Sequence, residues 1–93
     1  MTYDLVLDRS AEKELGRLSD ALRRRVFARL DILAANPRPR GCIPVEGASP
    51  GIYRIRVGDY RMTYEVDDAA HLITVWEIGH RGKTYQKVGR RGL

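Results

Sequence analysis

The strongest constraint on this fold is a switch in hydrophobic period after residue 51. Ile52–Val57 and Tyr60–Asp67 alternate apolar with polar side chains, which is the period of a β-strand. Only Gly58 and Asp59 separate the two runs, and two residues of this type between alternating runs predict a β-hairpin. We therefore expect the C-terminal half of the chain to form a sheet that starts with this hairpin.

The residues before the hairpin predict a strand followed by two helices. Residues 3–7 favour a short strand, after which Asp8 or Ser10 is expected to cap a helix. A second helix is expected from about Ala21 to Ala35. It ends there because Pro37 disfavours helical geometry at the residue before it.

Each predicted helix has an apolar stripe that would face the sheet. The stripes consist of Ala11, Leu15 and Leu18 in the first helix and of Leu22, Val26, Leu30 and Leu33 in the second. The arginines of the second helix, which are Arg23, Arg24, Arg25 and Arg29, lie largely off its stripe, so a solvated helix face explains them best. Residues 36–51 contain all four prolines and three of the nine glycines, a composition that predicts a loop.

A second turn, around residues 67–70, leads to a third predicted strand from roughly His71 to Gly79. The order of elements is typical of an α+β fold. We expect an N-terminal strand and two helices packed on one face of an antiparallel β-meander sheet. A chain of 93 residues suffices for one domain, so residues 1–93 are expected to form a single domain.

Composition restricts the partners and the compartment. The formal charge is +5, and fourteen of the seventeen cationic residues are Arg, whose planar guanidinium binds phosphate in a bidentate way. No acidic residue follows Glu77, so electrostatics favour a nucleic acid or an acidic protein as partner. No apolar run is long enough for a membrane span and the N-terminus lacks a signal segment, so we expect a cytoplasmic protein with no membrane partner. The single Cys42 is most simply a structural residue, and the spacing of the residues predicts neither a metal site nor a cofactor.

A two-residue turn fixes the register of the hairpin, because Val57 then pairs with Tyr60 and alternate pairs share a face. One face is apolar and suits the two helices; it consists of Tyr53, Ile55, Val57, Tyr60, Met62 and Tyr64. The other face carries Arg54, Arg56, Arg61 and Thr63, with Ile52 and Glu65 at its far end.

The opposition of Arg56 and Arg61 in this register is unfavourable by itself. Like charges directly opposed across strands destabilise a sheet, which suggests that an anion lies between them. Guanidinium groups on a rigid sheet suit a phosphate that gains charge in a transition state. A solvated face, partly neutralised by Glu65 and Glu77, explains the same pattern without a ligand, and the residues alone leave both interpretations open.

The alternation of the third strand slips between Val75 and Trp76, and a β-bulge there would explain the slip. With Trp76 and Ile78 facing the core, the open face would gain Glu77, Gly79 and Arg81. Tyr85 follows a few residues later. It could stack on a base, as aromatic rings do in proteins that bind single-stranded RNA, or fold back on the sheet as an ordinary tail residue.

A family resemblance rests on these same residues. The chain reads IYRIRVGDYRMTYEV from Ile52 to Val66, followed by Ile78-Gly79-His80-Arg81 and by Tyr85. This combination, with the order of elements before it, resembles the RelE branch of the RelE/ParE toxin superfamily over nearly the whole chain. The resemblance implies a RelE-like fold and the toxin of a type II toxin-antitoxin module, a ribosome-dependent mRNA endonuclease. Its expected partners are mRNA on the ribosome and a cognate acidic antitoxin, which neutralises the toxin in a hetero-oligomer.

The resemblance also implies an active site made of Arg54, Arg56, Arg61, Arg81 and Tyr85. In the implied reaction a ribose 2′-hydroxyl attacks the adjacent phosphate and expels the 5′-oxygen. We expect Arg56 and Arg61 to stabilise the phosphorane charge and Arg81 to lie near the leaving oxygen. Tyr85 would orient or stack the scissile nucleotide.

The general base of this reaction is left unassigned. Relatives often carry Lys at the positions of Arg54 or Arg56, where Lys can lose a proton, whereas the pKa of Arg exceeds about 12. Histidine titrates near neutral pH, but the parity of His80 points it away from the arginines. Glu46, at the end of the proline-rich loop, is a candidate by its proximity in sequence alone.

Two other functions fit the same residues. A ParE-like toxin that poisons DNA gyrase shares the fold and needs no nuclease centre, and a fold by itself does not decide function. A non-catalytic module could bind an acidic antitoxin segment through its arginines. The retention of all five residues of the implied active site favours the nuclease.

Overall fold

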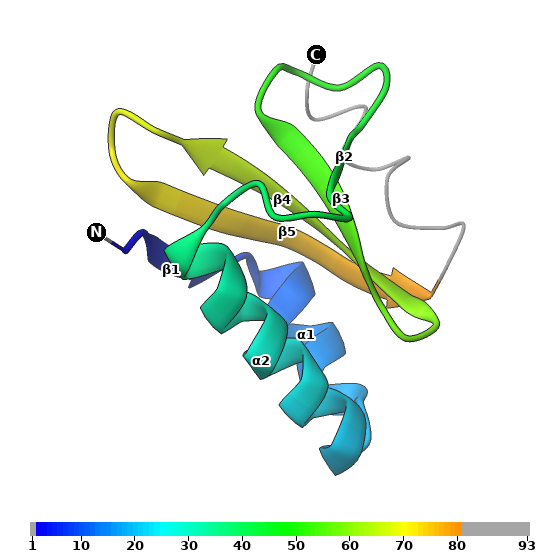
Figure 1. The fold of residues 1–93 in the computed structure, drawn as a ribbon. Coiled ribbons are helices and arrows are strands. Elements are labelled where there is room, and N and C mark those ends of the chain that lie inside the picture. The colour runs from blue at the N-terminus through cyan, green and yellow to red at the C-terminus, as the bar shows by residue number, and fades with distance from the viewer. Residues whose placement is uncertain (1, 81–93) are drawn as a thin grey trace.

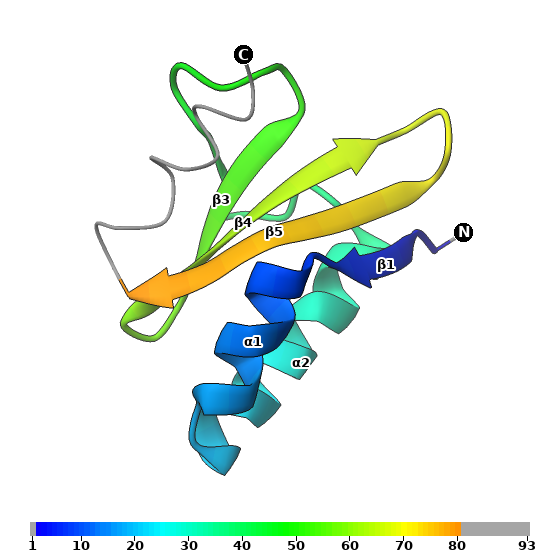
Figure 2. The same ribbon diagram turned by 180° about the vertical axis from the view of Figure 1, so that it is seen from behind.

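The computed structural model describes residues 2–80, which form two layers (Figure 1). Its elements in chain order are β1 (Asp4–Leu7), α1 (Arg9–Arg17), α2 (Asp20–Ala35), β2 (Ile43–Pro44), β3 (Ile52–Val57), β4 (Tyr60–Asp67) and β5 (Leu72–His80). Both helices lie below the sheet in either view, and no described helix covers its upper side (Figures 1 and 2). The predicted α+β architecture is confirmed, and we call the uncovered side the open face.

The sheet has the strand order β1-β5-β4-β3-β2. Strands β3, β4 and β5 form the predicted antiparallel meander. Strand β1 instead pairs in parallel with β5, with Leu5 opposite Ile73, so the sheet is mixed and the expectation of a wholly antiparallel sheet is corrected. Parallel neighbours are joined by a long crossover, and the local pattern of residues does not show which distant strand an N-terminal strand will join.

The proline-rich loop contains a short strand that its composition did not predict. Ile43 and Pro44 form the two-residue β2 and pair with Arg54 and Tyr53 of β3. Proline lacks the N–H that an inner strand would use, so it is tolerated here because β2 is the edge of the sheet. Residues 36–51 are therefore a loop with a short edge strand, not a loop throughout.

Side-chain caps set the start of each helix. The carboxylate of Asp8, one of the two predicted caps, accepts the N–H of Ser10 at 3.2 Å and begins α1. The hydroxyl of Ser19 accepts the N–H of Leu22 at 3.2 Å, so α2 begins at Asp20. These hydrogen bonds satisfy backbone donors that have no partner inside a helix.

The predicted stripes form the core between helices and sheet. Its most deeply buried members include Ala11, Val26, Leu33, Met62, Tyr64, Ile73 and Val75. Leu22 is only half-buried at the edge of this cluster, and Cys42 packs against it as a free thiol. The hydroxyl of Tyr64 donates to the carbonyl of Pro37 at 2.8 Å, and burial raises the pKa of this phenol.

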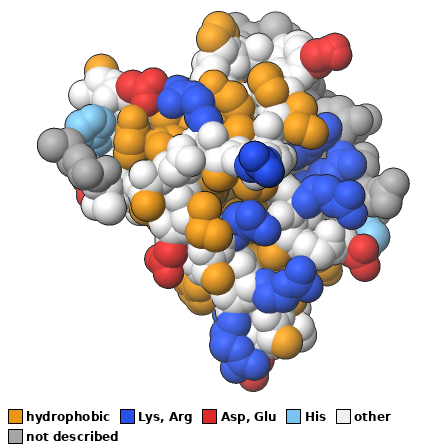
Figure 3. Space-filling model, viewed as in Figure 1, with side chains coloured by type: hydrophobic (Ala, Val, Ile, Leu, Met, Phe, Trp, Pro, Cys, Tyr) orange, Lys and Arg blue, Asp and Glu red, His pale blue; other side chains and the backbone are white. Residues whose placement is uncertain are grey.

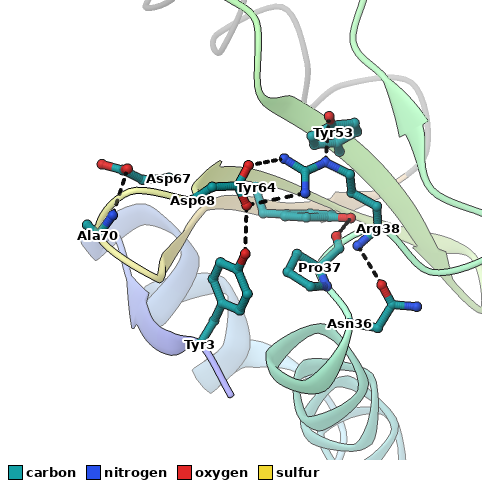
Figure 4. A network of polar contacts seen from close by, with 9 residues as sticks. All are labelled: Tyr3, Asn36, Pro37, Arg38, Tyr53, Tyr64, Asp67, Asp68 and Ala70. Carbon is teal, nitrogen blue, oxygen red and sulfur yellow. Dashed lines mark hydrogen bonds and ion pairs between the residues drawn. The ribbon is translucent and has the colours of Figure 1, made fainter. Parts of the chain in front are cut away.

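A polar network fastens the loop after α2 to the sheet (Figure 4). Arg38 donates to the two carboxylate oxygens of Asp68 at 2.8 and 3.3 Å and to the hydroxyl of Tyr53 at 3.0 Å. Tyr3 donates to the same carboxylate at 2.6 Å. The hydrogen bonds from Arg38 and then Tyr3 lower the pKa of Asp68. The carboxylate of Asp68 in the β4–β5 turn thus binds both the residue before β1 and the loop after α2.

Candidate functional site

The register of β3 and β4 gathers three arginines on the open face. Arg56 pairs with Arg61, and Arg54 pairs with Thr63, as predicted. Gly58 makes the turn between the strands with a φ of 62°, a left-handed value that glycine adopts without strain. Arg56 is exposed, while Arg54 and Arg61 are half-buried. We call these three arginines the basic face.

A β-bulge in β5 places the residues beside the basic face. Thr63 pairs with Glu77 while Tyr64 pairs with Val75, so Trp76 is the extra residue. The bulge is where the slip in alternation predicted it, but the expectation that Trp76 faces the core is wrong. Val75 is fully buried in the core, and Trp76 packs on the open face. Trp76, the bulged residue, is on the open face together with Glu77. The slip in alternation is therefore between Trp76 and Glu77, one position later than the sequence indicated.

Trp76 belongs to a small apolar cluster at the far end of the open face. The cluster consists of Val45, Ala48, Ile52 and Trp76, and it holds the loop after β2 against the sheet. The indole N–H of Trp76 donates to Oε1 of Glu65 at 3.0 Å. Glu65 and Trp76 are therefore hydrogen-bonded to each other at this end of the open face, one row of cross-strand pairs away from the row that contains Arg54.

Glu77 and Thr63 lie between this cluster and the basic face. The pairings place Arg54, Thr63 and Glu77 in one row across three strands. Thr63 is 0% exposed and Glu77 is 9% exposed, although both are on the open face. The hydroxyl of Thr63 has no hydrogen-bond partner. The sequence predicted that Glu77 is on this face, but as an exposed counter-charge to the arginines. Its pairing with the buried Thr63 is the feature that indicates its burial.

The other predicted site residues lie elsewhere. His80 pairs with Tyr60, a residue of the helix-facing side, and the two rings meet edge to face at 5.4 Å. His80 thus points away from the basic face, as its parity predicted. Glu46 is exposed in the loop that follows β2. Arg81 and Tyr85 are outside the described residues.

Cations are not confined to the open face. Figure 3 shows Lys and Arg side chains along the helical part of the molecule. On α2, Arg24 and Arg25 are exposed, Arg29 is half-buried, and Arg23 forms an ion pair with Asp20 at 3.4 Å. The interpretation of these arginines as a solvated helix face therefore fits the structure.

The described residues include neither a cluster of metal ligands nor a helix that could span a membrane. Within residues 2–80, no group of three or more His, Cys, Asp or Glu side chains is placed to hold a metal ion. No helix in this part of the chain is long and apolar enough to cross a bilayer.

The chain is similar to known proteins over most of its length. Residues 5–85 match the family model described as the ParE toxin of the type II toxin-antitoxin system, parDE. The chain belongs to the RelE/ParE superfamily of type II toxins. The family expected from the hairpin motif is thereby confirmed. A search of curated proteins finds no match.

Solved structures place this toxin beside RelE proteins. A chain of the archaeal RelE-RelB complex from Pyrococcus horikoshii OT3 is 31% identical with a TM-score of 0.75, and the alignment covers 90% of this chain and 100% of that one. A double mutant of the E. coli toxin RelE in the free state is 27% identical with a TM-score of 0.83, and both chains are covered over 100% of their length. The intact E. coli RelBE toxin-antitoxin complex contains a chain 25% identical with a TM-score of 0.75, covering 87% of this chain and 99% of that one.

Proposed function

We propose that this toxin is an endoribonuclease that cleaves mRNA on the ribosome, with the basic face as the centre of its active site. The observation that carries the proposal is the direct pairing of Arg56 with Arg61, next to Arg54. Opposed like charges cost stability, and a bound phosphate removes this cost because it accepts charge-assisted hydrogen bonds from guanidinium groups. The full-length alignment with E. coli RelE supports the RelE-like fold on which this proposal rests.

The reaction is an internal transfer at phosphorus. The ribose 2′-oxygen attacks the adjacent phosphate, and the bond to the 5′-oxygen breaks. The phosphorane between these two states has more negative charge on its equatorial oxygens than the ground state. Arg56 and Arg61 stabilise that charge from fixed positions on paired strands, where no reorganisation is needed at the moment of reaction.

Arg81 and Tyr85 enter the proposal from the resemblance, since both are outside the described residues. Arg81 follows β5 directly in sequence, and its role is to stabilise the leaving 5′-oxygen. Tyr85 orients the scissile nucleotide by stacking on its base.

The same face accounts for control by an antitoxin. The toxin, a single domain acting in the cytoplasm, would form a hetero-oligomer with a cognate acidic antitoxin. The RelE-RelB complex from Pyrococcus horikoshii and the RelBE complex from E. coli support this partner. An acidic segment is complementary to the basic face and would compete with mRNA for it.

Expression in a bacterium, followed by mapping of transcript 5′ ends, tests the proposal. Wild type should produce cuts phased with codons in translated messages. Arg61→Ala and Arg81→Ala should abolish them, because loss of one group that stabilises the transition state lowers the rate by about 10²–10³. The matched control is Arg24→Ala, which removes the same charge from exposed α2 and should leave the cuts unchanged.

A second function, poisoning of DNA gyrase, is favoured by the match to the ParE model. Intact messages together with the SOS response would support it and contradict the nuclease. Normal growth on expression of wild type would contradict both toxic activities and leave a module that only binds its antitoxin.

A further inference from the structure

The arginines of the basic face cannot take a proton from the attacking hydroxyl. Arginine keeps its proton throughout the physiological range. A 2′-hydroxyl is a weak nucleophile until its proton is removed, and a positioned base supplies about 10²–10⁴ in rate. The reaction proposed above therefore requires an acceptor beside the basic face.

Glu77 occupies such a place. It pairs with Thr63, whose other neighbour is Arg54, so a single row leads from the basic face to its carboxylate. It is also the diagonal neighbour of Arg61, because Arg61 pairs with Gly79. Diagonal neighbours on one face are about 7–8 Å apart, within reach of long side chains. Gly79 itself contributes no side chain between them.

Thr63 gives an independent sign of a ligand at this place. Its side chain is completely buried in the row between Arg54 and Glu77, and its hydroxyl has no hydrogen-bond partner. An unsatisfied buried hydroxyl costs about 1–3 kcal/mol, and such exceptions in folded proteins call for an explanation. A ribose hydroxyl or phosphate oxygen bound between Arg54 and Glu77 would satisfy it.

The other candidate bases are disfavoured by position. His80 contacts Tyr60 on the helix-facing side of the sheet. Glu46 is exposed in the loop after β2. Glu65 is on the open face, but its Oε1 accepts the indole N–H of Trp76 at the far end. Among the described residues, Glu77 is the carboxylate in the row that contains Arg54.

We propose that Glu77 is the general base of this toxin, an assignment that rests on the nuclease function proposed above. The carboxylate of Glu77 takes the proton of the 2′-hydroxyl as the 2′-oxygen forms its bond to phosphorus. The bond from phosphorus to the 5′-oxygen breaks, and the 5′-oxygen takes a proton from water. The products are a 2′,3′-cyclic phosphate and a 5′-hydroxyl, with the proton on Glu77 returned to solvent.

The test is single-turnover cleavage of mRNA on programmed ribosomes by the full-length purified toxin. Glu77→Gln keeps the size of the side chain and removes the base, so the rate should fall by about 10²–10⁴. Glu65→Gln is the matched control on the same face and should cleave at the wild-type rate. Glu77→Ala should be slow but regain rate in proportion to added formate, a rescue that a purely structural role of Glu77 would not give.

The pH profile of wild type provides a measurement that needs no variant. Arg61 on β4 and Arg54 on β3 face Glu77 from neighbouring strands and favour its ionised form, whereas its burial favours the neutral form. The rate should rise with pH as the carboxylate loses its proton and then stay level, and a rate that does not change with pH would contradict a general base.

The outcomes separate this inference from the function on which it rests. If wild type cleaves no message, the nuclease function itself is wrong. Cleavage by wild type and by Glu77→Gln at similar rates would overturn the assignment of Glu77 alone. The same holds if His80→Gln, and not Glu77→Gln, removes the activity.

Discussion

Arg56 and Arg61 face each other directly across the β3–β4 hairpin, two cations at opposed positions of a sheet. The strands that carry them are fixed by the core below, since the adjacent residues Ile55 and Met62 are almost completely buried. The repulsion between the two guanidinium groups therefore cannot be relieved by shifting one strand. We therefore expect the opposed charges to lower the stability of the free protein and a bound anion to offset this loss.

The first prediction is that removing one of these cations stabilises the free protein. Arg56→Gln should raise the free energy of unfolding by about 0.2–1 kcal/mol. The gain should shrink near about 1 M salt, where the Debye length falls to about 3 Å. Urea unfolding at low and high salt measures both effects, with Arg24→Gln on α2 as the control. A variant that is less stable than wild type at low salt would show that Arg56 has a structural role.

The second prediction concerns the pH dependence of the Asp68 network. The pKa of Asp68 is lowered in the folded protein by the hydrogen bonds from Arg38 and Tyr3. This carboxylate therefore contributes stability that is present above its unfolded pKa and is lost as the pH falls through the lower folded value. Asp68→Asn should thus be less stable than wild type near neutral pH, and the difference should vanish in strong acid.

Tyr3→Phe is the matched control for the Asp68 network. It removes one of the hydrogen bonds to Asp68 and keeps the ring, so it should show a smaller loss with the same dependence on pH. Thermal unfolding across the acid range provides the comparison. An Asp68→Asn deficit that persists at the lowest pH would mean that the deficit does not come from the charge of Asp68.

Local patterns predicted most of this fold because the relevant forces act between near neighbours. The two-residue turn at Gly58 fixed the pairing of Arg56 with Arg61 by counting alone. The spacing of Val26, Leu30 and Leu33 identified the face of α2 that is buried. In both cases, residues a few positions apart determine the geometry.

The features that were missed depend on contacts between distant segments. The parallel pairing of Leu5 with Ile73 joins the two ends of the described chain. Trp76 packs on the open face with Val45, from the loop after β2, and with Ile52, from the start of β3. The face of Glu77 was predicted correctly, but its burial was not, because the burial depends on its cross-strand neighbours and not on its own position in the alternation.

The third prediction concerns the unsatisfied hydroxyl of Thr63. Thr63→Val keeps the shape and removes the buried polar group, so the free energy of unfolding should rise by about 1 kcal/mol. Cleavage of mRNA should slow, because the hydroxyl no longer contacts the bound nucleotide. Thr74→Val is the control: Thr74 is a half-buried β5 residue opposite Glu65, and neither property should change. A loss of stability in Thr63→Val would contradict the inference that this hydroxyl is unsatisfied in the free protein and bonds only to a ligand.

The fourth prediction uses Trp76, the one tryptophan in the sequence, as a reporter of the open face. Trp76 lies next to Glu77 in β5, so a single-stranded oligonucleotide bound to the basic face should change its fluorescence. A DNA oligonucleotide, which has no 2′-hydroxyl, allows binding to be measured without cleavage. The logarithm of affinity should fall with the logarithm of salt by about 0.7 for each neutralised phosphate.

Variants of this titration locate the binding site. Arg54→Ala and Arg56→Ala should each weaken binding, and each should reduce the salt slope by about 0.7 if its guanidinium neutralises one phosphate. Arg24→Ala should leave both quantities unchanged, because Arg24 is on α2, below the sheet. Binding that is detected by anisotropy but leaves Trp76 fluorescence unaltered would place the nucleic acid on another surface. Arg24 and Arg25 would then be the residues to substitute next, since both are exposed cations on α2.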